Sequence, residues 1–136
     1  MRLLLAALLL VHGAAMGQTF ACQYTEAAGL KWENGRWKST EFRTAEPFFL
    51  KINGSVLDQK VAADVFGSRS PATAALVHCA KNPSRTTHSC MDGFGTFLFF
   101  DESTRLGGRA LMFGSASTSS AYRDTTSVAH FTCQQM

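Results

Sequence analysis

Charge and proline are scarce in this sequence, and no apolar run is long enough to span a bilayer. Charged residues make up 17% of the 136 residues, and only three prolines occur. No block of like charge is present, which argues against a disordered acidic or basic tail. The longest apolar stretch, Leu3–Val11, falls far short of the roughly 20 residues that a membrane-spanning helix needs. The composition therefore excludes a large multidomain enzyme and a helical membrane bundle, and it predicts one globular domain.

The first residues have the order of a secretory signal peptide. Arg2 supplies a positive charge, Leu3–Val11 forms the apolar core, and Ala15-Met16-Gly17 offers a small-x-small cleavage site. We therefore expect residues 1–17 to be removed during export and residues 18–136 to form a single β-rich domain. The expected location is secreted or periplasmic, with no transmembrane segment.

Four cysteines lie in the expected mature chain, namely Cys22, Cys79, Cys90 and Cys133. An even number in an oxidising compartment is typical of disulfides. The polar stretch 80–89 is predicted to be a loop that a Cys79–Cys90 bond would close at its base. Cys22 and Cys133 each follow a Phe two positions earlier, which places Phe and Cys on one face of each terminal strand and favours a Cys22–Cys133 bond. The other pairings stay open from the sequence alone.

A zinc site is the competing interpretation of the residues His78, Cys79, His88 and Cys90. Zinc requires four converging ligands, and paired ligands are usually separated by two to four residues. That gap is missing here, and the adjacent His78 and Cys79 would point to opposite faces of a strand. The pattern favours a disulfide with two nearby histidines, and no metal is expected.

Short alternating segments separated by turn residues predict a small antiparallel β-sandwich or β-barrel of seven to eight strands. Asn34-Gly35 is the strongest hairpin signal, because a type I′ turn needs positive φ at both central residues. The predicted strands cover residues 19–25, 30–33, 36–38, 46–52, 73–79, 94–100, 106–113 and 125–133. The expected core side chains are Trp37, Phe48, Leu50, Phe97, Phe99, Phe113 and Phe131.

One helix is predicted over about residues 55–66. Leu57, Val61 and Val65 recur at helical spacing, with Ser55 as the N-cap and Gly67 just after the last turn. A loop is expected to follow the helix, up to the strand that begins near Thr73.

Motifs for catalysis and cofactor binding are missing from the sequence. It contains no nucleophile elbow, Gly-rich phosphate loop, His-Glu-x-x-His motif or calcium loop. Asp101-Glu102 would suit acid–base chemistry on a sugar, but its position after Phe100 favours solvated turn residues. We therefore predict no catalytic residue and no cofactor. A net charge of +3 gives no reason to expect a nucleic-acid partner.

Arg85 and His88 are the candidate binding residues. They lie in the predicted disulfide-closed loop, and a loop anchored at both ends loses little entropy on binding. Arginine is also enriched in binding hot spots. The other arginines, including Arg105, Arg109 and Arg123, are interpreted as solubility charges.

Two limited resemblances accompany this hypothesis. Gly35-Arg36-Trp37 resembles the Gly-x-Trp that opens lipocalins, which carry small apolar ligands; the match covers three residues. The general plan is similar to that of periplasmic lysozyme inhibitors, although Met112–Ser117 is only loosely similar to their recognition loop.

The predicted function is an exported, non-catalytic binding module of the cell envelope or exterior, such as an inhibitor, immunity protein or recognition protein. Its expected partner is an envelope or extracellular protein, recognised through loops. A small apolar-ligand carrier with a β-barrel cavity, a structural envelope component and an enzyme remain as alternatives.

Overall fold

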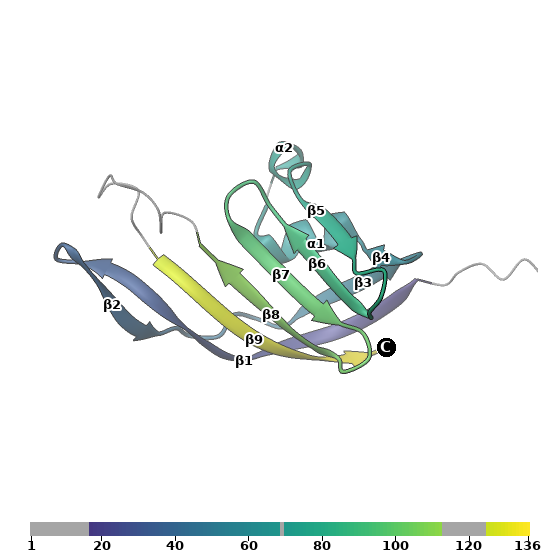
Figure 1. Cartoon of the computed structure of the whole chain (residues 1–136), viewed down its shortest axis with the longest axis horizontal. Helices are drawn as coiled ribbons and strands as arrows, with labels where there is room; N and C mark the ends of the chain where they lie inside the picture. Colours follow the sequence, from purple (N-terminus) through teal and green to yellow (C-terminus); the bar gives the residue numbers. More distant parts are fainter. Residues whose placement is uncertain (1–16, 69, 113–124) are drawn as a thin grey trace, which may run out of the picture.

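The computed structural model describes residues 17–68, 70–112 and 125–136, which form one antiparallel sheet with two short helices (Figure 1). The sheet curls into a nearly closed barrel of eight strands in the order β4-β3-β1-β9-β8-β7-β6-β5, and β2 pairs with β1 outside that path. The strands are β1 (Gln18–Glu33), β2 (Arg36–Glu41), β3 (Phe48–Asn53), β4 (Val56–Leu57), β5 (His78–Lys81), β6 (Thr87–Met91), β7 (Thr96–Asp101), β8 (Leu106–Leu111) and β9 (Thr125–Gln135). The helices are α1 (Gln59–Phe66) and α2 (Pro71–Ala74). The predicted mostly β fold is confirmed, and of the two predicted forms it is the barrel.

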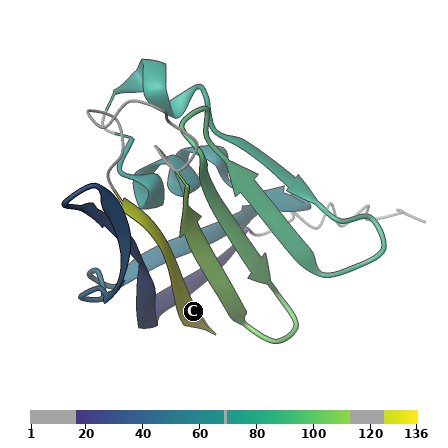
Figure 2. The same cartoon turned by 60° about the vertical axis from the view of Figure 1, so that its left-hand side comes forward.

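The barrel closes where β4 meets β5. These two strands are in contact, but no hydrogen-bonded ladder joins them in the described part of the chain. The helix α1 lies near this junction and contacts β3, β5 and α2 (Figure 2). No helix within the described ranges is long and apolar enough to cross a membrane.

Strand β1 is long because it pairs with two neighbours in turn. Its first residues pair with β3 and its last residues with β2, while β9 runs along both parts. The register shifts between Tyr24 and Glu26, where the two parts meet. The β1–β2 hairpin projects beyond the barrel (Figure 1). Its turn has φ angles of 51° at Asn34 and 78° at Gly35, as the Asn-Gly signal predicts.

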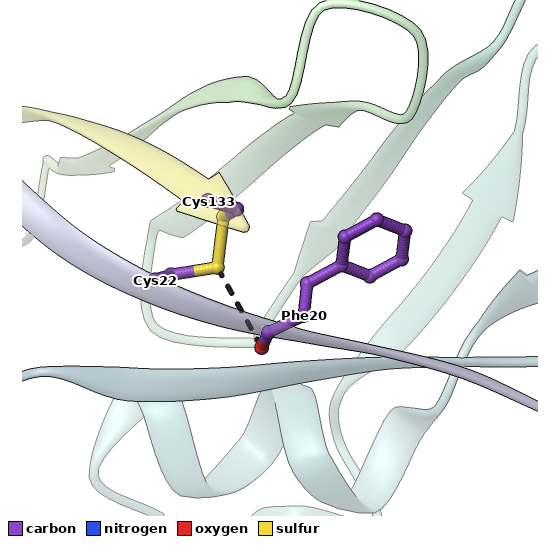
Figure 3. Close-up of a disulfide and its surroundings, with 3 residues drawn as sticks. All are labelled: Phe20, Cys22 and Cys133. Carbon is purple, nitrogen blue, oxygen red and sulfur yellow. Dashed lines mark hydrogen bonds between the residues drawn. A yellow bond between two sulfur atoms is a disulfide. The ribbon is translucent and has the colours of Figure 1, made fainter. Parts of the chain in front are cut away.

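Both predicted disulfides are confirmed. Cys22 bonds Cys133 and Cys79 bonds Cys90, and in each pair the two residues lie directly opposite one another on neighbouring strands. The Cα atoms are 4.0 Å apart in the first pair and 4.1 Å apart in the second. Figure 3 shows the first bond joining β1 to β9 beside Phe20. The two disulfides indicate an oxidising environment for this chain.

The helix begins at Gln59, four residues later than the predicted start at residue 55. Val56 and Leu57 pair with β3 as the short strand β4, and Asp58 is the N-cap of α1 through its carboxylate, which accepts a hydrogen bond from Val61 N at 3.0 Å. The chain leaves β3 through a turn at Gly54, so Ser55 belongs to a β-turn and not to the helix. The helix ends as expected at Gly67, whose φ is 77°.

The connection after α1 is also more regular than predicted. Residues 71–74 form α2, which starts with a capping box between Ser70 and Thr73 and has Pro71 in its first turn. Strand β5 therefore starts at His78, five residues later than expected. The capping pattern is present in the sequence, but the small residues after it were interpreted as a strand.

The barrel interior is a packed aromatic and aliphatic core. Leu50 and Phe131 are fully buried as predicted, and Phe48 packs against this core. The rings of Phe20 and Phe100 meet edge to face with centroids 4.9 Å apart. Phe48 and Trp37 are only partly buried, and Phe113 lies outside the described residues.

Phe97 and Phe99 are predicted to lie in the core, but the other face of β7 points inward, so this prediction is wrong. Leu98 and Phe100 point inward and are fully buried, whereas Phe97 is partly exposed and Phe99 is 50% exposed. The strand is apolar on both faces, so alternation alone does not say which face is inside, and a one-residue shift exchanges the two faces. The consequence is an exposed apolar surface on the outside of the barrel.

Candidate functional site

Arg85 lies at the tip of the β5–β6 hairpin, exposed as predicted. Asn82 organises the turn: its backbone N–H donates to Thr87 O at 2.9 Å, and its side-chain oxygen accepts from Ser84 N at 3.0 Å. Arg85 N in turn donates to Asn82 O at 3.2 Å. The backbone beneath the Arg85 side chain is therefore held by its own hydrogen bonds.

His88 does not lie in that loop. It belongs to β6, its side chain is fully buried, and it stacks at 6.4 Å on the ring of Phe100. The prediction that it shares an exposed contact surface with Arg85 is therefore wrong. Strand alternation places His88 on the same inward face as Cys90, and this signal was present in the sequence.

Glu102 is the centre of a polar cluster at this end of the barrel. Its Oε1 atom lies 2.7 Å from His88 Nε2 and 2.7 Å from Lys81 Nζ. Burial acts to raise the pKa of Glu102, but the hydrogen bonds from Lys81 and His88 and their electrostatic attraction outweigh it, and the pKa is lowered. Because the carboxylate is engaged by two donors, the cluster ties β5 and β6 to the β7–β8 turn; it is not an open acid–base site.

Asp101 is used in a second network beside this cluster. Its Oδ1 atom accepts from Thr86 Oγ1 at 2.6 Å, from Ser103 Oγ at 2.8 Å and from Ser103 N at 2.9 Å. These hydrogen bonds, with that of Thr86 the largest, lower the pKa of Asp101 to about 2. Asp101 and Glu102 thus join the β7–β8 turn to the β5–β6 hairpin. These contacts hold the hairpin whose tip carries Arg85.

The outward face of the sheet carries two uncharged cross-strand rows. In the ladders, Val128 pairs with Ala110, Ala110 with Phe97, Phe97 with Met91 and Met91 with His78. The neighbouring row contains His130, Gly108, Phe99, Ser89 and Ala80. Between β5 and β9 neither row contains a lysine, arginine, aspartate or glutamate, whereas on β1 the second row continues from His130 to Glu26.

Three apolar members of these rows are strongly exposed, whereas Phe97 and Ala110 are partly buried. The exposed fraction is 58% for Val128, 50% for Phe99 and 49% for Met91. Phe97, Phe99 and Met91 also line a groove of about 280 Å³ on this outward face, whose lining includes the residues Cys79 and Cys90. We call the surface formed by Met91, Phe97, Phe99, Ala110 and Val128 the outer apolar wall.

A separate pocket of about 500 Å³ opens where α1 and α2 meet the ends of β7, β8 and β9. It is lined by Phe66, Gly67, Ser68, Ser70, Thr73, Asp92, Phe94, Thr96, Leu111 and Thr125. We call it the mouth pocket. Its lining combines a few apolar side chains with hydroxyl groups and one carboxylate among the described residues.

The histidines and cysteines considered for zinc do not converge. His78 is exposed on the outward face, whereas His88 is buried inside, and Cys79 and Cys90 are bonded to one another. Within the ranges that the structure describes, no three potential ligands come together.

No known protein family, curated protein or solved structure shows significant similarity to this chain. Its function therefore has to be inferred from the surfaces and pockets described above.

Proposed function

We propose that this chain is an exported, non-catalytic recognition protein that binds a partner protein through its outer apolar wall. The observation that carries the proposal is the exposure of Phe99 and Met91 in two outward rows that hold no lysine, arginine, aspartate or glutamate between β5 and β9. Contiguous exposed apolar patches are uncommon on monomeric soluble proteins and mark interaction sites. Phenylalanine and methionine are also among the residues enriched in protein interfaces.

The wall is suited to binding because it is rigid. The Cys79–Cys90 bond crosses the β5–β6 pair beneath the groove, and the Glu102 cluster fixes the far end of the same strands. Few side chains would need to be ordered on binding, which lowers the entropic cost. Arg85, at the tip of the same hairpin, is the proposed polar contact at the rim of the interface.

The location of the partner follows from the proposed export. The sequence of residues 1–17 predicts a signal peptide, and the disulfides require an oxidising compartment. We infer that the partner is an envelope or extracellular protein with a complementary apolar strip. Intact mass of the exported protein should give a chain that begins at Gln18; a retained Met1 would contradict export by cleavage.

Comparative capture tests the proposal. The mature chain, Phe99→Lys and Phe49→Lys serve as three baits in extracts of the producing organism's envelope and medium. Phe49 is the matched control because it is 57% exposed on β3, separated from β7 by β1, β9 and β8 in the sheet. A true partner should be enriched on the first and third baits and lost from Phe99→Lys.

The captured protein must then bind directly as a purified component. The same captured proteins on all three baits would overturn the proposal. A dimer of the chain itself that Phe99→Lys dissociates, measured by light scattering, would instead assign the wall to a second copy.

A further inference from the structure

Arg109 faces the inside of the barrel. It lies opposite Leu98 on β7 and Ala129 on β9, and paired residues of neighbouring strands share a face. Leu98 is fully buried in the core, so the face that carries Arg109 is the inner one. The interpretation of Arg109 as a surface solubility charge is therefore wrong.

Arg109 is only partly buried, but the described part of the chain offers no hydrogen bond to the buried Nε atom of its guanidinium. No ion pair of this residue is found there either. Arginine keeps its charge at any pH that a folded protein tolerates. A buried donor left unpaired destabilises the folded state, and more so when it is charged. An anion supplied from outside would remove that penalty.

The mouth pocket begins one inward row away from Arg109, which is not itself among the lining residues. The next inward row towards the open end pairs Thr96 with Leu111 and Leu111 with Ser127. Rows two residues apart along a strand are separated by about 7 Å, within reach of an extended arginine side chain. Thr96 and Leu111 both line the mouth pocket. The inward residues of β9 at this level, Ser127 and Ala129, are small and partly exposed.

We propose that Arg109 and the mouth pocket form a binding site for an amphipathic monocarboxylate. The apolar body of the ligand would contact Phe66, Phe94 and Leu111, and its carboxylate would take paired hydrogen bonds from the Arg109 guanidinium. A volume of about 500 Å³ suits a small organic molecule. This site is separate from the outer apolar wall and does not depend on the proposed protein partner.

Asp92 limits the charge of that ligand. Its Oδ1 atom accepts hydrogen bonds from Phe94 N at 2.9 Å and from Thr96 N at 2.8 Å, so its negative charge stands at the pocket. A second anionic group on the ligand would be repelled by it. A single carboxylate at the Arg109 end of the pocket is therefore favoured over a phosphate or a dicarboxylate.

The test compares decanoate with methyl decanoate by calorimetry on the mature, disulfide-bonded chain. Decanoate should bind at least tenfold more tightly, because only the carboxylate can pair with the guanidinium. Arg109→Met should remove that preference and raise the melting temperature of the ligand-free protein, since an unpaired charge is gone. Arg85→Met, which changes an exposed arginine far from the pocket, should leave decanoate binding within twofold of wild type.

Equal affinity for the acid and the ester, or no binding of decanoate, would overturn the proposal. Arg109→Met with unchanged decanoate binding would make Arg109 a structural residue only and would overturn it as well. The wild-type comparison decides the question even if the variant does not fold. If Arg85→Met loses partner binding but still binds decanoate, the partner-binding proposal and the carboxylate-site proposal are tested independently.

Discussion

His88 Nε2 lies 2.7 Å from Glu102 Oε1, although the two residues belong to different hairpins of the barrel. His88 comes from inside β6, and Glu102 from the turn between β7 and β8. Lys81 on β5 reaches the same carboxylate oxygen. A single carboxylate thus joins three elements beside the hairpin that carries Arg85, and its protonation should weaken that end of the barrel.

Stability should fall on acidification, starting near pH 4.5. The folded pKa of Glu102 is lowered from its usual 4.5, so its contribution is complete above that value and is lost as the pH falls through the folded pKa. Asp101, with a pKa lowered to about 2 from 3.8, should add a further loss between those two values. Denaturant unfolding at a series of pH values measures this dependence.

Glu102→Gln should cost about 1–3 kcal/mol at pH 7 and should flatten the acid limb of the pH profile. Glu46→Gln, at an exposed position between β2 and β3, is the control and should change the free energy of unfolding by less than about 0.5 kcal/mol. A Glu102→Gln profile as steep as that of wild type would show that the cluster does not carry the pH dependence.

Gly107 should tolerate no side chain, whereas its neighbour should. A Cβ at Gly107 would lie 2.2 Å from Cζ of the buried Phe131 ring, while a Cβ at Gly108 would meet nothing closer than Ala129 O at 3.5 Å. Gly107→Ala should therefore destabilise by about 1–3 kcal/mol through overpacking, and Gly108→Ala by much less. Chemical denaturation of the two variants gives the comparison, and equal effects would place the Phe131 ring elsewhere.

The two disulfides should differ in their contribution to stability. Cys22–Cys133 closes a loop with a sequence separation of 111 residues, and Cys79–Cys90 one of 11. In the chain-entropy account their removal should cost about 5 and about 3 kcal/mol respectively. The double variants Cys22→Ala/Cys133→Ala and Cys79→Ala/Cys90→Ala measure this. A larger loss from the second pair would indicate that it holds native contacts that the first does not.

Truncation should cost far more stability at Phe100 than at Phe99, although the two residues are adjacent. Phe100 is fully buried, so Phe100→Ala should cost about 3–5 kcal/mol. Phe99 is 50% exposed, so Phe99→Ala should cost much less and should act mainly on partner binding. Melting temperatures of the two variants separate them, and a severe loss from Phe99→Ala would mean that the outer wall is part of the folded core.

The features predicted correctly from the sequence were those with a strong local or covalent signal. Asn34-Gly35 fixed one hairpin because its turn needs positive φ, and the spacing of Phe and Cys indicated the terminal disulfide. Gly67 marked the end of α1 for the same conformational reason. These signals depend on a few neighbouring residues and need no knowledge of the tertiary fold.

The missed features that bear on the candidate sites depend on which face of a strand is inside. The side chains of β7 are apolar on both faces, so the exposure of Phe99 appears only once the barrel closes. The inward direction of Arg109 follows from its pairing with Leu98 and Ala129, which no local pattern reveals. The outer apolar wall and the proposed site formed by Arg109 and the mouth pocket could therefore not be predicted from local sequence patterns.

The most direct test of the recognition proposal is the affinity of the purified partner for three forms of the mature chain. Phe99→Lys should weaken binding by at least a hundredfold, because it places a charge in the apolar centre of the interface. Phe49→Lys should bind as wild type does, and all three melting temperatures should agree within a few degrees. Equal affinity of wild type and Phe99→Lys for the partner would contradict the account.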